Sequence, residues 1–191
     1  MRVNPASIAF DIDSVIADTM QLFLDIARDH YRIDTIRYED FTTYDLNECL
    51  DLDEAVITDI IDRIQQGRYV SRLKPIKGAP EGLVKVGQVA SPVLFVTARP
   101  HPGPIDQWFR STVALAPACF EIVATGSYER KISVLREKGV DCFVEDRLET
   151  CYELQAAGIT PILFKQPWNR RPHPFMEVED WNELECLLGI R

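Results

Sequence analysis

The stretch Ser7-Ile8-Ala9-Phe10-Asp11-Ile12-Asp13 decides how the rest of the chain is interpreted. A short apolar run, suited to a buried strand, ends in two aspartates that are separated by one residue. Side chains alternate between the two faces of an extended chain, so Asp11 and Asp13 point into the same small volume. Two carboxylates this close repel each other, and such a pair persists where a cation or a proton offsets the repulsion or where catalysis uses it. The end of this strand is therefore the first candidate site.

Composition narrows the class of protein before any motif is considered. The chain has 191 residues, of which 46% are hydrophobic, enough for one core with a small appended module. A net charge of -9 and a pI near 4.9 argue against nucleic acid polymers or an anionic membrane as main partners. No apolar run approaches the roughly 20 residues that cross a bilayer. The five cysteines form no C-x-x-C motif, which favours reduced thiols, and we expect a cytoplasmic protein.

Residues 18–74 have a helical character throughout. Apolar side chains recur at helical spacing over residues 18–31 and again over residues 52–66, where Asp51 and Glu54 resemble a capping box. No convincing strand pattern occurs between residues 18 and 74. The sequence therefore predicts a main domain of residues 1–17 and 75–191 and a small helical cap of residues 18–74, inserted after the first strand.

From residue 75 onward, strand and helix patterns alternate. Apolar strands are predicted at residues 93–97, 120–124, 140–144 and 161–164, with helices between them and a last helix that starts near Trp181. Strands that are apolar on both faces and alternate with helices are typical of a parallel sheet covered on both sides. The expected fold is α/β, with three layers. In such sheets, functional residues gather outside the carboxyl ends of the strands.

Polar side chains that can carry phosphoryl-transfer chemistry follow the predicted strands. They are Asp11 and Asp13 after the first strand, Thr97 after the second, Thr125 after the third, Glu145 and Asp146 after the fourth, and Lys131 on the helix after the third strand. Carboxylate oxygens are the hard ligands that Mg²⁺ prefers. A carboxylate nucleophile beside such an ion, with a lysine and a hydroxyl group on the transferring group, makes a phosphoryl-transfer site.

Four ordered motifs resemble those of the haloacid dehalogenase (HAD) superfamily of phosphotransferases. The motifs are Asp11-Ile-Asp13-Ser-Val15-Ile, Phe95-Val-Thr97-Ala-Arg, Lys131, and Phe143-Val-Glu145-Asp146-Arg. The runs 11–18 and 162–170 are similar to the deoxyribonucleotidase branch, the type C 5′-nucleotidases. This resemblance implies a Rossmann-like three-layer α/β/α core with a helical cap after the first strand.

The resemblance also implies a role for each matching residue. Asp11 would attack phosphorus and form an aspartyl-phosphate, and Asp13 would protonate the leaving oxygen and then activate water. Thr97, Ala98 and Lys131 would hold the phosphate group. A Mg²⁺ cofactor would be bound by Asp11, by the backbone carbonyl of Asp13 and by Asp146, with Glu145 supporting them. The partner would be a small phosphorylated metabolite, and the oligomeric state is left open.

The sequence departs from the family pattern at several positions. Ser14 stands where this branch usually has glycine, and Glu145 replaces the commoner aspartate. The predicted cap contains no tryptophan, so Phe41 and Tyr44 are candidates either for stacking on a nucleobase or for packing within the cap. Arg99 and Arg147 follow strand ends and are candidates for phosphate contacts or for structural ion pairs.

Three alternative functions differ from that of a nucleotidase. A phosphatase for sugar phosphates or another metabolite would keep the same mechanism, and the lack of tryptophan in the cap is compatible with it. A receiver-type signalling domain also uses acidic residues, a hydroxyl and a lysine, but the helical insertion and the placement of both aspartates after one strand argue against it. A non-catalytic phosphate-binding protein would have lost some of the motifs, whereas all are present. The sequence therefore favours a magnesium-dependent phosphomonoester hydrolase that resembles 5′-nucleotidases.

Overall fold

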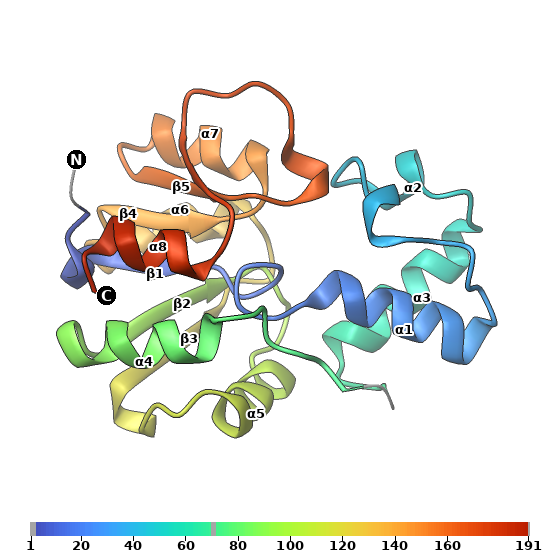
Figure 1. The fold of residues 1–191 in the computed structure, drawn as a ribbon, viewed down its shortest axis with the longest axis horizontal. Coiled ribbons are helices and arrows are strands. Elements are labelled where there is room, and N and C mark those ends of the chain that lie inside the picture. The colour runs from blue at the N-terminus through green and yellow to red at the C-terminus, as the bar shows by residue number, and fades with distance from the viewer. Residues whose placement is uncertain (1–2, 70–71, 191) are drawn as a thin grey trace.

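Six parallel strands form the sheet at the centre of the molecule. The computed structural model describes residues 3–69 and 72–190. The strand order is β3-β2-β1-β4-β5-β6, and every neighbouring pair is parallel (Figure 1). The strands are β1 (Ile8–Phe10), β2 (Val93–Thr97), β3 (Phe120–Ala124), β4 (Cys142–Glu145), β5 (Thr160–Phe164) and β6 (Met176–Val178). The predicted parallel α/β fold is confirmed.

Helices cover both faces of the sheet and complete the predicted three layers. The helices α4 (Ala79–Val89), α5 (Gly103–Thr112) and α8 (Trp181–Leu188) cover one face, and α6 (Glu129–Glu137) and α7 (Leu148–Ala156) cover the other. Successive residues of β1 serve opposite layers, because side chains alternate along a strand. Phe10 packs against Trp181 of α8, with ring centroids 5.8 Å apart. Ala9 belongs to the cluster on the opposite face, which contains Leu135 of α6.

A group of helices extends beyond the carboxyl ends of the strands (Figure 1). It contains α1 (Thr19–Tyr31), the short α2 (Leu46–Cys49) and α3 (Glu54–Gln65), and we call the described part of residues 18–74 the helical module. The helices α1 and α3 are in contact. Residues 70–71 of the predicted cap, and residues 1–2 and 191 of the predicted main domain, lie outside the described residues.

Two details of the sequence-based prediction are corrected by the structure. The N-cap of α3 is Asp53, whose side chain accepts a hydrogen bond from the amide of Ala55, so the capping box predicted for Asp51 and Glu54 is wrong. Because α3 begins at Glu54, that side chain lies at the first helical position and not at the third, where a capping box needs it. The strand β6 was not predicted, since it has three residues and follows a proline-rich segment.

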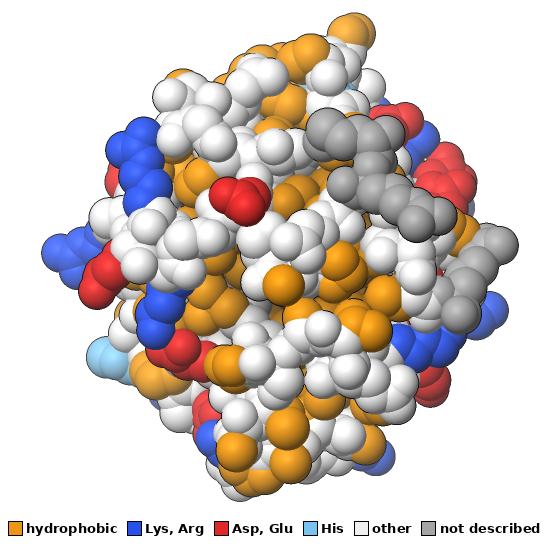
Figure 2. Space-filling model, turned by 90° about the vertical axis from the view of Figure 1, so that its left-hand side faces the viewer, with side chains coloured by type: hydrophobic (Ala, Val, Ile, Leu, Met, Phe, Trp, Pro, Cys, Tyr) orange, Lys and Arg blue, Asp and Glu red, His pale blue; other side chains and the backbone are white. Residues whose placement is uncertain are grey.

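The end of the molecule opposite the helical module carries the two chain ends that Figure 1 marks. Seen from this side, hydrophobic side chains occupy the centre of the surface and charged ones lie mainly around its edge (Figure 2).

The five cysteines are free thiols, as predicted. Within the described residues, no helix combines the length and the apolar character that crossing a membrane requires.

Candidate active site

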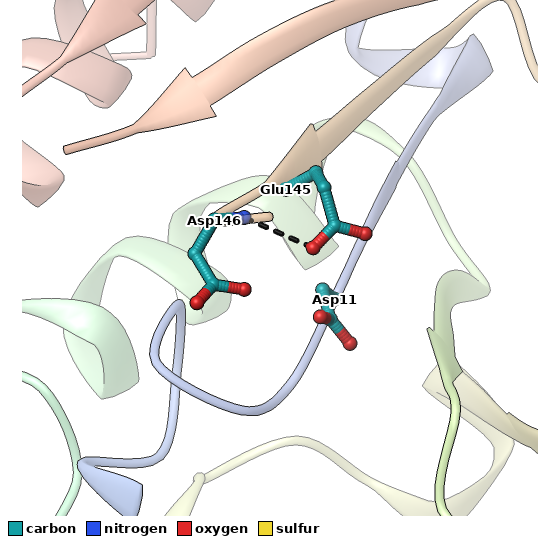
Figure 3. A group of neighbouring side chains, drawn as sticks. All are labelled: Asp11, Glu145 and Asp146. Atoms are coloured by element: carbon teal, nitrogen blue, oxygen red, sulfur yellow. Dashed lines mark hydrogen bonds between the residues drawn. The ribbon is translucent and has the colours of Figure 1, made fainter. Parts of the chain in front are cut away.

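Three buried carboxylates meet where β1 and β4 end. Asp11 follows β1, Glu145 is the last residue of β4 and Asp146 is the next one, and all three point into one space (Figure 3). Their ligand oxygens lie within 4.8 Å of one another. The sheet itself creates this proximity, because β1 and β4 pair in parallel and the amide of Asp11 donates to the carbonyl of Val144 over 2.9 Å. The parallel strands therefore end side by side, as the sequence predicted.

Lys131 supplies the positive charge between two of these carboxylates. It lies on the first turn of α6, is completely buried, and its Nζ is 2.9 Å from Asp11 Oδ2 and 2.9 Å from Glu145 Oε2. Burial by itself lowers the pKa of a lysine, but the charges of Asp11 and Glu145 outweigh it and raise the pKa of Lys131. The ammonium group therefore stays charged at neutral pH.

Glu145 organises the lysine and the loop that follows β4. Its Oε2 accepts from Lys131, and its Oε1 accepts from the backbone amides of Asp146 at 3.1 Å and Arg147 at 3.0 Å. Burial tends to raise the pKa of Glu145, but Lys131 and these hydrogen bonds outweigh it and lower the pKa. Both carboxylate oxygens are thus already engaged, which suits the supporting role that the sequence resemblance implied.

Asp146 is held by Trp168 and Asn169; the sequence indicates Asn169 only as part of a basic run, residues 169–171, that either covers the site entrance or forms a solvated loop. The indole Nε1 of Trp168 donates to Asp146 Oδ2 over 2.9 Å, and Asn169 Nδ2 donates to the backbone carbonyl of Asp146 over 2.8 Å. Burial and the neighbouring charges of Glu145 and Asp11 raise the pKa of Asp146 well above its usual range. The signal that could have identified Trp168 and Asn169 was the resemblance of residues 162–170 to the nucleotidase branch.

Asp13 has surroundings that differ sharply from those of Asp11. Arg99 donates from Nε to Asp13 Oδ2 over 3.0 Å and from Nη2 to Oδ1 over 2.6 Å. The hydroxyl of Thr19 donates to Oδ1 over 2.6 Å, and that of Thr97 donates to Oδ2 over 3.3 Å. Burial tends to raise the pKa of Asp13, but Arg99 and these donors outweigh it and lower the pKa. The arginine therefore stabilises the ionised form of Asp13.

The pKa of Asp11 moves in the opposite direction. Burial raises it most, the nearby carboxylates of Glu145 and Asp13 raise it further, and Lys131 offsets only part of the effect. Because Lys131 is shared with Glu145, it does not neutralise Asp11 alone. Two aspartates from one strand end thus have pKa values that their different partners shift in opposite directions.

A cavity of about 360 Å³ opens above these groups. Its polar floor includes Asp11, Asp13, Thr97, Ala98, Arg99 and Asp146. Its walls on the side of the helical module combine apolar and polar side chains: Met20, Phe23, Leu46, Ile61 and Ile64 are apolar, and Thr19, Thr43, Tyr44 and Gln65 are polar. Lys131 lies beneath the floor. The cavity therefore joins an acidic end, with three carboxylates and one arginine, to an end that is partly apolar.

The two aromatic candidates of the predicted cap occupy different places. Phe41 is completely buried and packs edge-on against Phe23, with ring centroids 5.7 Å apart, so it belongs to the packing of the helical module. Tyr44 lines the cavity, and its hydroxyl lies 3.0 Å from the hydroxyl of Tyr128 in the core. The guanidinium of Arg147 lies 4.5 Å from the ring centre of Tyr128. Arg147 is therefore engaged with aromatic rings.

Comparison with known families identifies the chain. The family described as "5' nucleotidase, deoxy (Pyrimidine), cytosolic type C protein" matches residues 4–191. The chain belongs to this family. The resemblance of its motifs to the type C 5′-nucleotidases is thus confirmed, and this type C 5′-nucleotidase family member is an enzyme, a phosphatase. No protein of curated function matches it significantly.

Solved structures, among them those of two HAD-family hydrolases, share the fold of this nucleotidase family member. The HAD-hydrolase YfnB from Bacillus subtilis, bound to magnesium, is similar with a TM-score of 0.68 and 15% identity over 100% of both chains. The protein CbbY from Rhodobacter sphaeroides, in complex with phosphate, has a TM-score of 0.57 and 16% identity, over 96% of this chain and 99% of its own. A HAD family hydrolase from Deinococcus radiodurans, with bound phosphate and sodium, has a TM-score of 0.59 and 16% identity, over 96% and 95%. At such identities the likeness establishes the fold alone.

Proposed function

We propose that this protein is a magnesium-dependent phosphomonoester hydrolase that acts on 5′-nucleotides through a phosphorylated Asp11. The observation that carries the proposal is that two aspartates from one strand end line the cavity floor beside the buried carboxylate cluster. Asp11 and Asp146 lie on the cavity floor above Lys131, and Asp13 is held beside them by Arg99. This arrangement supports Asp11 as the nucleophile and Asp13 as the group that exchanges a proton, the roles that the family resemblance implies.

The chemistry of the carboxylate cluster fits a magnesium ion. Asp11, Glu145 and Asp146 are all buried, and one lysine offsets only part of their charge. The pKa values of Asp11 and Asp146 are consequently raised, and a divalent cation would favour their ionised forms. We assign the metal to Asp11 and Asp146, with the backbone carbonyl of Asp13 as a further ligand. When bound, the ion would neutralise charge that develops on the transferring phosphoryl group.

The residues of the site then divide the reaction into two steps. In the first, a carboxylate oxygen of Asp11 bonds to phosphorus, the ester P–O bond breaks, and Asp13 gives a proton to the leaving oxygen. In the second, water bonds to phosphorus and gives its proton to Asp13, while the bond between phosphorus and Asp11 breaks. Thr97, the backbone at Ala98, and Lys131 hold the phosphoryl group through both steps.

The cavity walls favour a nucleotide over a sugar phosphate. The helical module contributes a hydrocarbon surface to the cavity, with Met20, Phe23 and Ile61 among its residues, and the polar side chains of Thr43, Tyr44 and Gln65 beside it. The hydrocarbon surface suits the flat face of a base, and the polar side chains can pair with the edge of that base. We propose that residues 18–74 act as the cap, which covers the substrate and excludes water from the phosphorylated intermediate.

The test is phosphate release from a panel of deoxyribonucleotides, ribonucleotides and sugar phosphates, with and without Mg²⁺. Asp11→Asn removes the nucleophilic charge with little change in shape, and we expect a loss of at least about 10³-fold in turnover. Asp106→Asn is the matched control, since Asp106 pairs with Arg110 on α5, away from the cavity. Normal turnover by Asp11→Asn would overturn the mechanism. Release confined to sugar phosphates would overturn the substrate assignment alone.

A further inference from the structure

Arg99 joins the candidate acid and base to the helical module. It follows β2 in the core, and only 5% of its surface is exposed. Besides the two hydrogen bonds to Asp13, its Nη1 donates to the backbone carbonyl of Ile64 over 3.1 Å. One side chain therefore contacts both Asp13 and the last turn of α3.

The contact with Asp13 fixes the direction of that carboxylate. A planar guanidinium that donates to both oxygens defines the plane of the carboxylate as well as its distance. The hydroxyls of Thr19 and Thr97 add one donor to each oxygen. Without Arg99, these two neutral donors are the hydrogen-bond partners left to the Asp13 side chain in the described residues, and neither one spans both oxygens.

The contact with α3 suits a position at the end of a helix. Ile64 is the penultimate residue of α3, where backbone carbonyls lack regular intrahelical partners and a positive charge is favoured. Thr19, at the start of α1, also donates to Asp13, whereas the hydrogen bond from the Tyr38 hydroxyl to Gln166 at 3.1 Å involves no catalytic carboxylate. Arg99 is the residue through which α3 reaches Asp13 in the described part of the chain. Arg99 is therefore placed to transmit the position of α3 to Asp13.

We propose that Arg99 is a positioning residue that couples the docking of α3 to the orientation of Asp13. This inference rests on the proposed two-step hydrolysis. When α3 is docked, the carbonyl of Ile64 accepts a hydrogen bond from Nη1 of Arg99. Nε and Nη2 of Arg99 then orient the carboxylate of Asp13 toward the cavity. Asp13 then accepts the proton of the water that attacks phosphorylated Asp11, as the bond between that phosphorus and Asp11 breaks. With α3 displaced, Arg99 loses its anchor and Asp13 loses its fixed direction.

The experiment separates the two chemical steps with p-nitrophenyl phosphate and Mg²⁺. p-Nitrophenolate leaves without a proton donor, so phosphorylation of Asp11 depends little on Asp13, whereas hydrolysis of the intermediate depends on it. We expect Arg99→Gln to release one equivalent of p-nitrophenolate at nearly the wild-type rate and then to turn over about 10- to 100-fold more slowly. Arg99→Lys keeps the charge, but its single ammonium group cannot donate to both oxygens of Asp13 as the guanidinium does. We therefore expect the same burst with a smaller loss of turnover.

A second readout follows the α3 end directly by amide hydrogen exchange. The amides of Gly67 and Arg68, which bond to the carbonyls of Ile64 and Arg63, should exchange faster in both Arg99 variants. Arg110→Gln is the matched control for loss of an arginine, and Tyr38→Phe is the control for loss of another contact between the helical module and the core. Neither control should produce a burst or faster exchange at the α3 end.

The outcomes distinguish this inference from the proposed function. Equal slowing of both phases without a burst would mean that Arg99 is merely structural, and unchanged exchange at the α3 end would remove the coupling to the helical module. Failure of the wild-type protein to release phosphate from any ester would overturn the proposed function itself. If thermal melting shows that Arg99→Gln does not fold, Arg99→Lys decides the question.

Discussion

At the scale of single residues, the site is defined by the contrast between Asp11 and Asp13. The two side chains follow the same strand end. Asp11 shares its ion-pair partner Lys131 with Glu145, whereas Asp13 is the carboxylate that forms an ion pair with Arg99. Burial acts on both carboxyl groups, and the difference in their partners decides the direction of each pKa. The sequence predicted that the two carboxylates cluster, but the residue that separates their pKa values was only one of two arginine candidates.

Ser14, which stands where the nucleotidase branch usually has glycine, strains the backbone of the loop after Asp13. Its backbone has φ of 59°, in the left-handed region, its side chain is buried, and its carbonyl accepts from Gln166 Nε2 over 2.7 Å. A residue with a Cβ atom is strained there by about 1–2 kcal/mol, and a glycine would lose about 0.4–1 kcal/mol through greater freedom of the unfolded chain. The loop therefore adopts the glycine-like conformation with a serine in place.

We accordingly predict that Ser14→Gly raises the free energy of unfolding by up to about 1 kcal/mol, because relief of strain exceeds the entropy cost. The measurement is urea denaturation followed by circular dichroism. Arg32→Gly is the control, since Arg32 has φ of 60° at the end of α1, away from the cavity. A clear loss of stability in Ser14→Gly alone would mean that the serine side chain makes a stabilising contact.

At the scale of elements, close packing of α4 against α8 holds one layer of the core together. A Cβ atom on Gly82 would lie 2.5 Å from Cε3 of the Trp181 ring. That indole is 1% exposed, and its Nε1 donates to the carbonyl of Val15 over 2.8 Å, so it has little room to move. The helix α8 thereby supports the loop that follows Asp13, and this packing reaches the site from outside it.

Gly82→Ala should therefore lower the free energy of unfolding by about 1–3 kcal/mol, in spite of the better helix propensity of alanine. The matched control on the same helix is Gly87→Ala, whose Cβ would meet Cδ2 of Leu115, the end of a flexible side chain. Thermal and urea unfolding of both variants would test the difference. Equal stability of the two variants would show that the Trp181 ring can shift without cost.

At the scale of the whole molecule, binding of a cation at the carboxylate cluster should be linked to folding and to pH. The pKa values of Asp11 and Asp146 are raised in the folded protein, so between the ordinary carboxyl pKa and the raised one the metal-free folded state binds more protons than the unfolded chain. Its stability in this range therefore falls as the pH rises, as far as these two groups are concerned. A bound cation replaces those protons and removes the penalty.

We predict that the rise in melting temperature caused by Mg²⁺ grows as the pH increases from acidic to neutral, and that the Kd for Mg²⁺ falls in parallel. When the ion is about a hundredfold above its Kd, the stabilisation should be about 2.7 kcal/mol. Differential scanning calorimetry with matched ionic strength measures both trends. Asp146→Asn should abolish most of the shift. A Mg²⁺ effect that is equal at every pH, or largest in acid, would contradict the proposed metal site.

The sequence by itself determined the parallel α/β fold and the gathering of Asp11, Thr97, Lys131, Glu145 and Asp146 at one edge of the sheet. Both follow from short-range information, since the alternation of strands and helices is a local pattern, and parallel strands end at the same edge. The assignment of roles to these residues, the boundaries of the cap and a cytoplasmic location stay predictions.

Only the tertiary structure decided how the site is closed and held. It placed Trp168 and Asn169 against Asp146, and it joined Arg99 to both Asp13 and the carbonyl of Ile64. The Arg99 contacts cross 86 and 35 positions of the chain, and the contact between Trp168 and Asp146 crosses 22. Every residue has a backbone carbonyl, so no side-chain type in the sequence indicates which carbonyl Arg99 binds. The contact between Arg99 and α3 could therefore be identified only from the folded structure.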